Sequence, residues 1–282
     1  MTLDMALKQG ITLLKQHNIE DAELDGWYLM EYCFHITRVE YLMNSGQPIS
    51  DDEYAAYLKL IQKRADHIPL QHITGVQEFM GLSFRVNEEV LIPRQDTEVL
   101  VAEVLKVSKG KTVLDMCTGS GCIIISLYKL GDIKNGVGVD VSEKALAVAR
   151  QNGELLDSKV TFLQSDLYQE IHDTFDIIVS NPPYIPTKDI DSLMEEVRVH
   201  DPLLALDGKA DGLYFYREIA KRLKEFLNPG GLIFFEIGHD QGETVPAILK
   251  EAGITDIKVS KDLAGLDRIV SGRHKIDEEP FT

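Results

Sequence analysis

From Thr97 onward the chain alternates between helical and strand-like patterns, and this alternation constrains the fold more than any other feature. Apolar residues recur at helical spacing in five segments: 97–108, 121–130, 142–152, 211–227 and 241–252. Short apolar runs typical of strands stand in seven others: 112–116, 136–140, 160–163, 175–180, 231–237, 256–260 and 267–272. Strands that alternate with helices predict an α/β domain whose mostly parallel sheet is covered by helices on both faces.

The chain before this region has a different pattern. Residues 1–72 are predicted to be helical, because apolar residues recur at helical spacing and because Ser50 and Glu53 have the spacing of a capping box. Residues 73–92 alternate apolar and polar positions around Gly75 and Gly81, which predicts a β-hairpin linker. We therefore expect a small helical domain, a hairpin and a larger domain over 93–282. The helical domain is either a stability module or a substrate-docking domain.

The charge of the chain bears on its partners. Its formal net charge is −17, and no run of Lys or Arg forms a local basic patch. An acidic surface repels nucleic acid, so direct nucleic-acid binding is not expected and a basic protein or small molecule is the favoured partner.

The cysteines and the N-terminus indicate the compartment. The three cysteines lack CxxC spacing, which favours reduced thiols in the cytoplasm and no metal site: Cys33, Cys117 and Cys122. Asp4 and Lys8 interrupt the N-terminal apolar residues, so no signal peptide is expected, and no segment is long enough to span a membrane.

A glycine-containing turn follows the first strand of the larger domain. Residues 113–122 run from an apolar strand through Gly119 and Gly121 into an apolar helix. Glycines here let backbone N–H groups approach a ligand beside a helix N-terminus. The third glycine of a dinucleotide fingerprint is missing, because position 124 is Ile. This argues against a diphosphate ligand.

Two acidic residues follow the next strands. Asp140 ends its strand about 20 residues past the glycines, where an acidic residue can accept hydrogen bonds from ribose hydroxyls. Its alternative role is to cap the next helix, which Ser142 can also do. Asp166 follows the third strand and could meet an adenine edge, with Leu167 packing on the ring; its alternative is a turn residue.

The fourth strand runs directly into Asn181-Pro182-Pro183-Tyr184. In a parallel sheet this edge binds ligands. The prolines stiffen the loop and lack N–H donors, so their carbonyls and the Asn181 oxygen can accept both hydrogens of one –NH₂ group. Accepting these hydrogens increases the nucleophilicity of an amide nitrogen held about 3–3.5 Å from a methyl donor. The loop thus indicates N-methylation of a planar amide or amine; its alternative is a rigid turn with a packed tyrosine.

Several motifs in order resemble the HemK-type family of bacterial peptide chain release factor glutamine N5-methyltransferases. The resemblance runs from about residue 66 to 273 and includes these segments: 69–75, 78–79, 90–98, the glycine turn, Asp140, 181–185, 205–208, 211–213, 229–231 and 236–238. It implies a seven-stranded Rossmann-like methyltransferase sheet, with S-adenosylmethionine as cofactor and class 1 release factors as partners. The target it implies is the glutamine of their Gly-Gly-Gln loop.

The resemblance also implies roles for individual residues. Cofactor contacts are expected from Cys117, Thr118, Gly119, Ser120, Gly121, Asp140, Asp166, Leu167 and Asn181. Substrate contacts are expected from Asn181, Pro182, Pro183 and Tyr184, with Asn181 and Tyr184 as catalytic residues. Three positions depart from the family pattern: Cys117 replaces a usual glycine, Gln95 a common proline, and Asp201 a frequent glutamate.

The alternatives left open are a glutamine methyltransferase of a ribosomal protein, a DNA amino-methyltransferase and a non-catalytic adenosyl-ligand binder.

Overall fold

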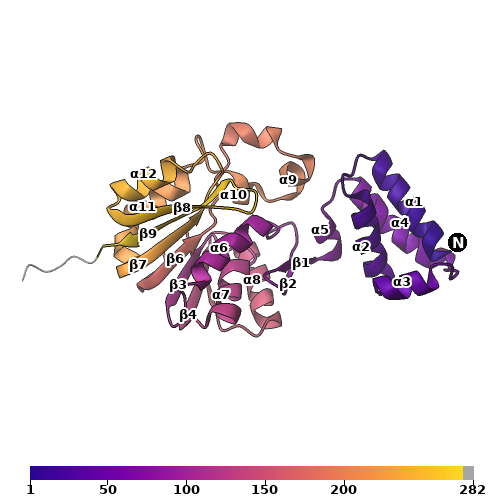
Figure 1. The fold of residues 1–282 in the computed structure, drawn as a ribbon, viewed down its shortest axis with the longest axis horizontal. Helices are drawn as coiled ribbons and strands as arrows, with labels where there is room; N and C mark the ends of the chain where they lie inside the picture. Colours follow the sequence, from indigo (N-terminus) through magenta and orange to yellow (C-terminus); the bar gives the residue numbers. More distant parts are fainter. Residues whose placement is uncertain (276–282) are drawn as a thin grey trace, which may run out of the picture. The chain divides into compact units, whose positions relative to one another are not determined.

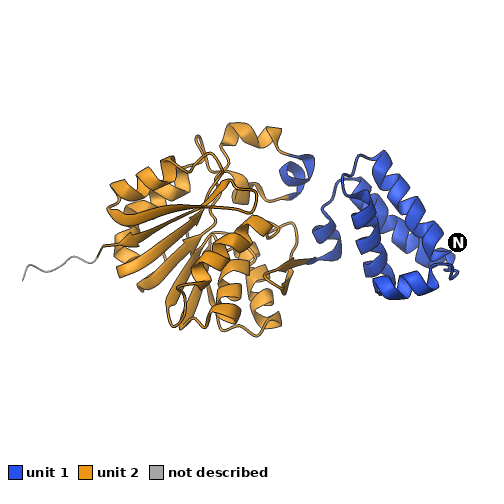
Figure 2. Cartoon of the chain, in the orientation of Figure 1, with its two compact units in different colours: residues 1–76, 194–200 blue, residues 77–193, 201–282 orange. Residues whose placement is uncertain are grey.

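The computed structural model describes residues 1–275, which form two compact units (Figure 2). The helical unit comprises Met1–Val76 and Met194–His200. The sheet unit comprises Gln77–Leu193 and the described residues from Asp201 onward. The sequence did not indicate that a short stretch near residue 197 groups with the first 76 residues.

The helical unit is built from amphipathic helices. Their bounds are α1 Leu3–Gln16, α2 Ala22–Phe34, α3 Arg38–Asn44, α4 Asp51–Ala65, α5 Leu70–Thr74 and α9 Glu195–His200. The predicted capping box is confirmed, because Ser50 accepts from the Glu53 amide while the Glu53 carboxylate accepts from the Ser50 amide. Tyr57 is fully buried and its hydroxyl donates to the Gly26 carbonyl at 3.0 Å. Apolar residues of α1, α2 and α4 form a separate buried cluster, so the unit has a packed core of its own.

A buried arginine holds α9 in the helical unit. Arg64 on α4 donates from Nε to Asp25 of α2 at 2.6 Å and from Nη2 to Glu196 of α9. Burial favours neutral groups, yet the two carboxylates raise the pKa of Arg64, so it stays charged. Removing Arg64 would leave the buried Asp25 carboxylate without its counter-charge.

Within residues 1–275, the sheet unit contains a seven-stranded sheet in the order β5-β4-β3-β6-β7-β9-β8 (Figure 1). The strands are β3 Thr112–Met116, β4 Asn135–Asp140, β5 Thr161–Gln164, β6 Phe175–Ser180, β7 Leu227–Glu236, β8 Ile254–Lys261 and β9 Asp267–His274. β9 runs antiparallel to β7 and β8, and the remaining pairs are parallel. The predicted mostly parallel α/β fold is confirmed.

Helices cover both faces of this sheet (Figure 1). They are α6 Gln95–Leu105, α7 Cys122–Gly131, α8 Glu143–Leu155, α11 Tyr214–Phe226 and α12 Thr244–Glu251. Alternate strand residues enter different apolar clusters: Val113 packs with α6 and α7, whereas Leu114 packs with α11 and α12. Side chains alternate between the faces of a strand, and this alternation places the sheet between two helical layers.

The strand register brings four turns to one edge of the sheet. Met116 at the end of β3 pairs with Val139 of β4 and with Ser180 of β6. Ser180 in turn pairs with Phe235 of β7. The residues that follow these pairs are Cys117, Asp140, Asn181 and Glu236, so all four lie at the carboxyl edge where parallel sheets bind ligands.

The predicted hairpin is present as β1 Val76–Phe79 and β2 Leu82–Arg85. Three short helices that the sequence did not predict lie between β6 and α11: η1 Thr187–Ser192, α9, and α10 Leu203–Leu206. Across residues 1–275, the helices are too short or too polar to cross a membrane.

Candidate active site

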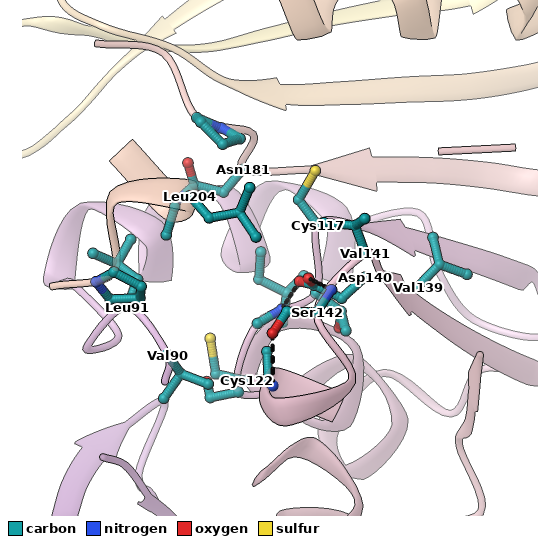
Figure 3. A pocket seen from close by; sticks show the side chains of 18 of the residues that line it. Val90, Leu91, Cys117, Cys122, Val139, Asp140, Val141, Ser142, Asn181 and Leu204 are labelled. Carbon is teal, nitrogen blue, oxygen red and sulfur yellow. Dashed lines mark hydrogen bonds between the residues drawn. The ribbon is translucent and has the colours of Figure 1, made fainter. Parts of the chain in front are cut away.

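A cavity of about 230 Å³ opens at the carboxyl edge of the sheet, entirely within the sheet unit (Figure 3). Figure 3 shows Cys117, Asp140 and Asn181 around it, together with Val90, Leu91 and Leu204. The structure therefore brings residues from the glycine turn, the second strand end and the Asn-Pro-Pro-Tyr loop to one cavity.

The glycine turn wraps one side of the cavity. Cys117 and Gly119 have positive φ angles of 58° and 54°, and Gly121 has 78°. A Cβ at Gly121 would lie 3.0 Å from Ile125 and 3.1 Å from Phe162, so that position requires glycine for space as well as for φ. Gly121 is not among the cavity-lining residues, whereas Cys117, Thr118, Gly119 and Ser120 are.

A buried carboxyl supports this turn from beneath. Thr118 donates its hydroxyl to Asp115 Oδ2 at 2.6 Å, and both side chains are buried. Burial raises the pKa of Asp115 to about 7, and the Asp140 carboxylate adds to the rise.

Asp140 joins the first two turns of the site. Its carboxylate accepts from the Gly119 amide at 3.0 Å and from the Ser142 amide at 2.9 Å. Burial raises the pKa of Asp140, while these amides act in the opposite direction by favouring the charged form. Ser142 caps α8 by accepting from the Ala145 amide, so Asp140 does not act as that cap.

The third turn places Asp166 and Leu167 on the cavity. Asp166 is exposed and Leu167 is half-buried with a positive φ of 52°. Ser165 donates its hydroxyl to the Leu167 carbonyl at 2.7 Å, and this bond holds the leucine in its left-handed conformation.

The acceptor loop begins directly after β6. Asn181 and Pro183 line the cavity, whereas Pro182 and Tyr184 do not. Asn181 donates from Nδ2 to Thr97 Oγ1 at 3.2 Å.

Tyr184 packs against the apolar cluster of α11 and α12, and its carbonyl accepts from Gln241 Nε2 at 3.1 Å. Burial raises the pKa of Tyr184 to about 12, so its hydroxyl is a neutral donor and not a base.

Glu236 lies behind Asn181 and is almost completely buried. Burial raises its pKa to about 7, while side-chain hydrogen bonds from Thr97 and Asn181 favour its charged form. Sequence motifs containing Thr97 and Glu236 supported the resemblance, but neither residue was assigned a role. Their proximity to Asn181 depends on the placement of α6, β6 and β7, which bring the three residues together.

Several apolar residues that line the cavity were also not assigned to the site from the sequence. They come from before α6 and from after the acceptor loop: Val90, Leu91, Pro93, Leu204 and Phe215. Leu204 stands in a stretch without clear periodicity, so no local signal marked it as part of the site.

Two family models match the chain: the PrmC N-terminal domain over residues 5–75 and the Methyltransferase small domain over residues 95–208. A release factor glutamine methyltransferase from Geobacter sulfurreducens is 43% identical over 262 residues, covering 92% of each chain. The corresponding enzyme from Caulobacter vibrioides is 39% identical and covers 99% of each chain. The chain belongs to the release factor glutamine methyltransferase family. It is therefore an S-adenosylmethionine-dependent protein-glutamine methyltransferase.

Solved structures agree with the fold. A methyltransferase from Pyrococcus furiosus has a TM-score of 0.55 at 17% identity, covering 70% of this chain and 91% of its own. A ribosomal protein L11 methylase from Lactobacillus delbrueckii subsp. bulgaricus has a TM-score of 0.51 at 20% identity, covering 68% and 85%. At these identities the likeness concerns the fold alone.

The residues at the cavity fit the cofactor of the family. The Asp140 carboxylate accepts from the backbone amides of Gly119 and Ser142, and a carboxylate has further acceptor sites that suit hydroxyl groups such as those of a ribose. Leu167 and Val141 offer apolar surface for an adenine ring, and Asp166 stands beside them. The turn presents no basic side chain to the cavity, as suits a ligand without phosphates.

The three departures from the family pattern have structural consequences. Cys117 adopts the left-handed φ that glycine tolerates best. Gln95 is the first residue of α6, a position that proline also suits. Asp201 accepts from Arg94 Nη2 at 2.7 Å, so its shorter side chain still forms an ion pair beside the cavity.

Proposed function

We propose that this enzyme methylates the side-chain amide nitrogen, N5, of the glutamine in the Gly-Gly-Gln loop of class 1 release factors. The observation that carries the proposal is the orientation of Asn181, whose Nδ2 is directed to Thr97. This leaves Oδ1 as an acceptor on a cavity-lining residue. When bound, S-adenosylmethionine would supply the methyl group from its sulfonium and become S-adenosylhomocysteine, and the amide nitrogen would lose one of its two protons.

The acceptor loop suits a primary amide. Asn181 Oδ1 and the Pro182 carbonyl would accept the two hydrogens of the glutamine amide and hold its nitrogen toward the cavity. Tyr184 does not line the cavity, so it would contribute chiefly by fixing the loop, through the contact of its carbonyl with Gln241. A lysine ammonium fits less well, because it brings a third donor and must first lose a proton.

The cofactor assignments are part of the same proposal. Asp140 would bind the ribose, Asp166 and Leu167 the adenine, and residues 117–120 the rest of the cofactor. Gly121 would act indirectly, because it allows the tight packing of the turn. We place the enzyme in the cytoplasm, where release factors work.

The test is mass spectrometry of a release factor after incubation with enzyme and cofactor. We expect one added methyl group, located on the Gly-Gly-Gln glutamine by fragmentation. Methylation of a ribosomal-protein glutamine or of DNA adenine, with the release factor unmodified, would show that the substrate assignment is wrong. Binding of cofactor without transfer to any of these would favour a non-catalytic binder.

The helical unit is proposed to dock the release factor. Three large side chains on one face of α2 are exposed although they are apolar or aromatic: Leu24 by 50%, Tyr28 by 43% and Tyr32 by 44%. Their spacing of four residues forms a stripe along the helix. Exposed apolar stripes of this kind mark protein-binding surfaces more often than chance surface residues do.

Replacing Leu24, Tyr28 and Tyr32 with serine tests the docking role. We expect kcat/KM for whole release factor to fall about tenfold or more, because aromatic anchors dominate interface energies. Methylation of a short Gly-Gly-Gln peptide should be unchanged. The matched control is Leu155→Ser, which changes a leucine 53% exposed in the sheet unit. Equal losses on peptide and whole protein would contradict docking by this face.

A further inference from the structure

We infer that Glu236 is a positioning residue that, through Thr97, fixes the orientation of the Asn181 side-chain amide and so keeps Asn181 Oδ1 available to accept from the substrate. The inference rests on the proposed function, because it concerns the atom that receives the glutamine amide. It adds a function for two buried residues outside the acceptor loop.

The strand register places the carboxylate beside the asparagine. Ser180 pairs with Phe235, and both strands run in the same direction. The next residue of each strand is Asn181 on β6 and Glu236 on β7. Thr97, in the first turn of α6, is 3% exposed and Glu236 is 2% exposed, so water does not compete for their hydrogen bonds. Tyr216 donates its hydroxyl to the Glu236 carbonyl at 2.8 Å and anchors this end of β7.

The single hydroxyl proton of Thr97 fixes the direction of the hydrogen bonds among Asn181, Thr97 and Glu236. The Thr97 hydroxyl accepts from Asn181 Nδ2 at 3.2 Å, so its own single proton must be donated elsewhere. The side chains of Thr97 and Asn181 both favour the charged form of the Glu236 carboxyl, as donors to it do, and its buried Oε2 has no other hydrogen-bond partner within residues 1–275. A carboxylate only accepts, so the order runs from Asn181 Nδ2 through the Thr97 hydroxyl to Glu236. A flipped Asn181 amide would direct Oδ1 at two acceptors, which is unfavourable.

A protonated Glu236 would remove this constraint. A neutral carboxyl can itself donate to Thr97, the hydroxyl can then turn, and the inverted Asn181 amide gains a donor. The other titratable or charged groups that interact with Glu236 are Arg268 on β9, Asp96 on α6, Tyr184 after β6, Tyr216 on α11 and Cys122 on α7. Arg268 favours the charged form and Asp96 the neutral one. The enzyme should therefore be active when Glu236 is charged.

The first experiment compares variants that keep side-chain shape. Glu236→Gln and Thr97→Val should each lower kcat about tenfold or more, as expected when an acceptor for the transition state is misoriented. The cofactor Kd and the KM for release factor should stay within about twofold. Thr97→Ser keeps the hydroxyl and should restore most of the turnover. Wild-type kcat in both Glu236→Gln and Thr97→Val would overturn the inference, and so would equal losses in Thr97→Val and Thr97→Ser.

The pH profile separates positioning from packing. Wild-type kcat/KM should rise with pH through about 7, where the Glu236 carboxyl in the free enzyme loses its proton. Glu236→Gln should lack that rise, because it has no group to titrate. A variant that retained the same acidic limb would show that another group controls it.

A readout without substrate distinguishes this inference from the proposed function. The side-chain amide resonances of Asn181, assigned by their absence from Asn181→Ala, should titrate in the cofactor-free enzyme with a midpoint near 7. They should stop titrating in Glu236→Gln and in Thr97→Val. If the chemical shifts of these resonances do not change with pH in the wild type, the positioning role is overturned. An enzyme that shows this titration but leaves release factors unmethylated would overturn the substrate assignment alone.

Discussion

The two walls of the cavity are built in different ways. On the side proposed to hold the cofactor, here called the cofactor wall, Asp140 is held by the amides of Gly119 and Ser142, which lie 21 and two residues away. On the side proposed to hold the substrate amide, here called the acceptor wall, Asn181 is held by the side chain of Thr97, which lies 84 residues away. Backbone amides keep their positions when side chains change, whereas a side-chain contact disappears with one substitution. The cofactor wall should therefore tolerate changes around it better than the acceptor wall.

Each wall also rests on a buried carboxyl. Asp115 lies beneath the glycine turn and Glu236 beneath the acceptor loop, and burial raises the pKa of each to about 7. Asp115 accepts from Thr118, three residues along the same turn. Glu236 instead connects α6, β6 and β7. The same chemical group thus stabilises a local turn in one wall and sets the orientation of a distant side chain in the other.

The largest expected effect is on the acceptor wall. Asn181→Ala removes the acceptor proposed to contact the amide nitrogen mainly during transfer, and we expect kcat to fall about 100- to 1,000-fold, as for other preorganised transition-state contacts. Cofactor affinity measured by calorimetry should change by less than about threefold. Near-normal turnover would break the distinction between the walls, because Asn181 would then act no differently from a lining residue.

The next effect belongs to the cofactor wall. Asp140→Ala removes a charged acceptor, which costs about 1.5–3 kcal/mol, so cofactor binding should weaken about tenfold or more. At saturating cofactor the turnover should recover most of its wild-type value. The control is Asp166→Ala, an exposed carboxyl at the rim, for which we expect a smaller loss of affinity. Unchanged affinity in calorimetry of Asp140→Ala would refute the ribose assignment.

The two walls also differ in how much of each could be predicted from the sequence. β3 and β6 begin and end at their predicted residues, because each is a buried run bounded by polar positions. The turns after β3, β4 and β6 were found because strand ends carry local motifs. Thr97 and Glu236 received no role, since their partner Asn181 is distant in sequence and only the sheet register brings them together. The placement of Tyr184 outside the cavity lining was likewise set by packing against α11 and α12, which no local pattern encodes.

A third effect concerns stability and pH. The pKa of Asp115 is raised from an ordinary 3.8 to about 7, so the folded state binds its proton more tightly than the unfolded state does. The free energy of unfolding should therefore fall as pH rises from about 4 to 7 and level off above that range. Asp115→Asn keeps an acceptor for Thr118 but does not ionise, and it should remove part of this fall, on the order of 1–2 kcal/mol.

Thermal melting of the cofactor-free protein at pH 5 and pH 8 provides the measurement. Wild type should lose more stability between these values than Asp115→Asn does, and Glu236→Gln should show a similar but separate gain at pH 8. A wild-type melting temperature that rises across this window would show that the two carboxyls are already ionised in the folded state at pH 5.

The smallest effect tests the strain in the glycine turn itself. Cys117 has a φ of 58°, a conformation that costs a non-glycine residue about 1–2 kcal/mol. Cys117→Gly removes that cost but makes the unfolded chain more flexible, which costs about 0.4–1 kcal/mol. The net gain in the free energy of unfolding should be about 0.5 kcal/mol, with cofactor affinity unchanged.

Gly121→Ala makes the reverse change in the same turn, and its Cβ would meet Ile125 and Phe162 at a φ of 78°. That variant should be clearly less stable and should bind cofactor more weakly, since the turn would have to shift. If Cys117→Gly instead destabilised the protein or weakened binding, the thiol would be contributing contacts that outweigh its strain, and the cofactor wall would depend on a side chain as the acceptor wall does.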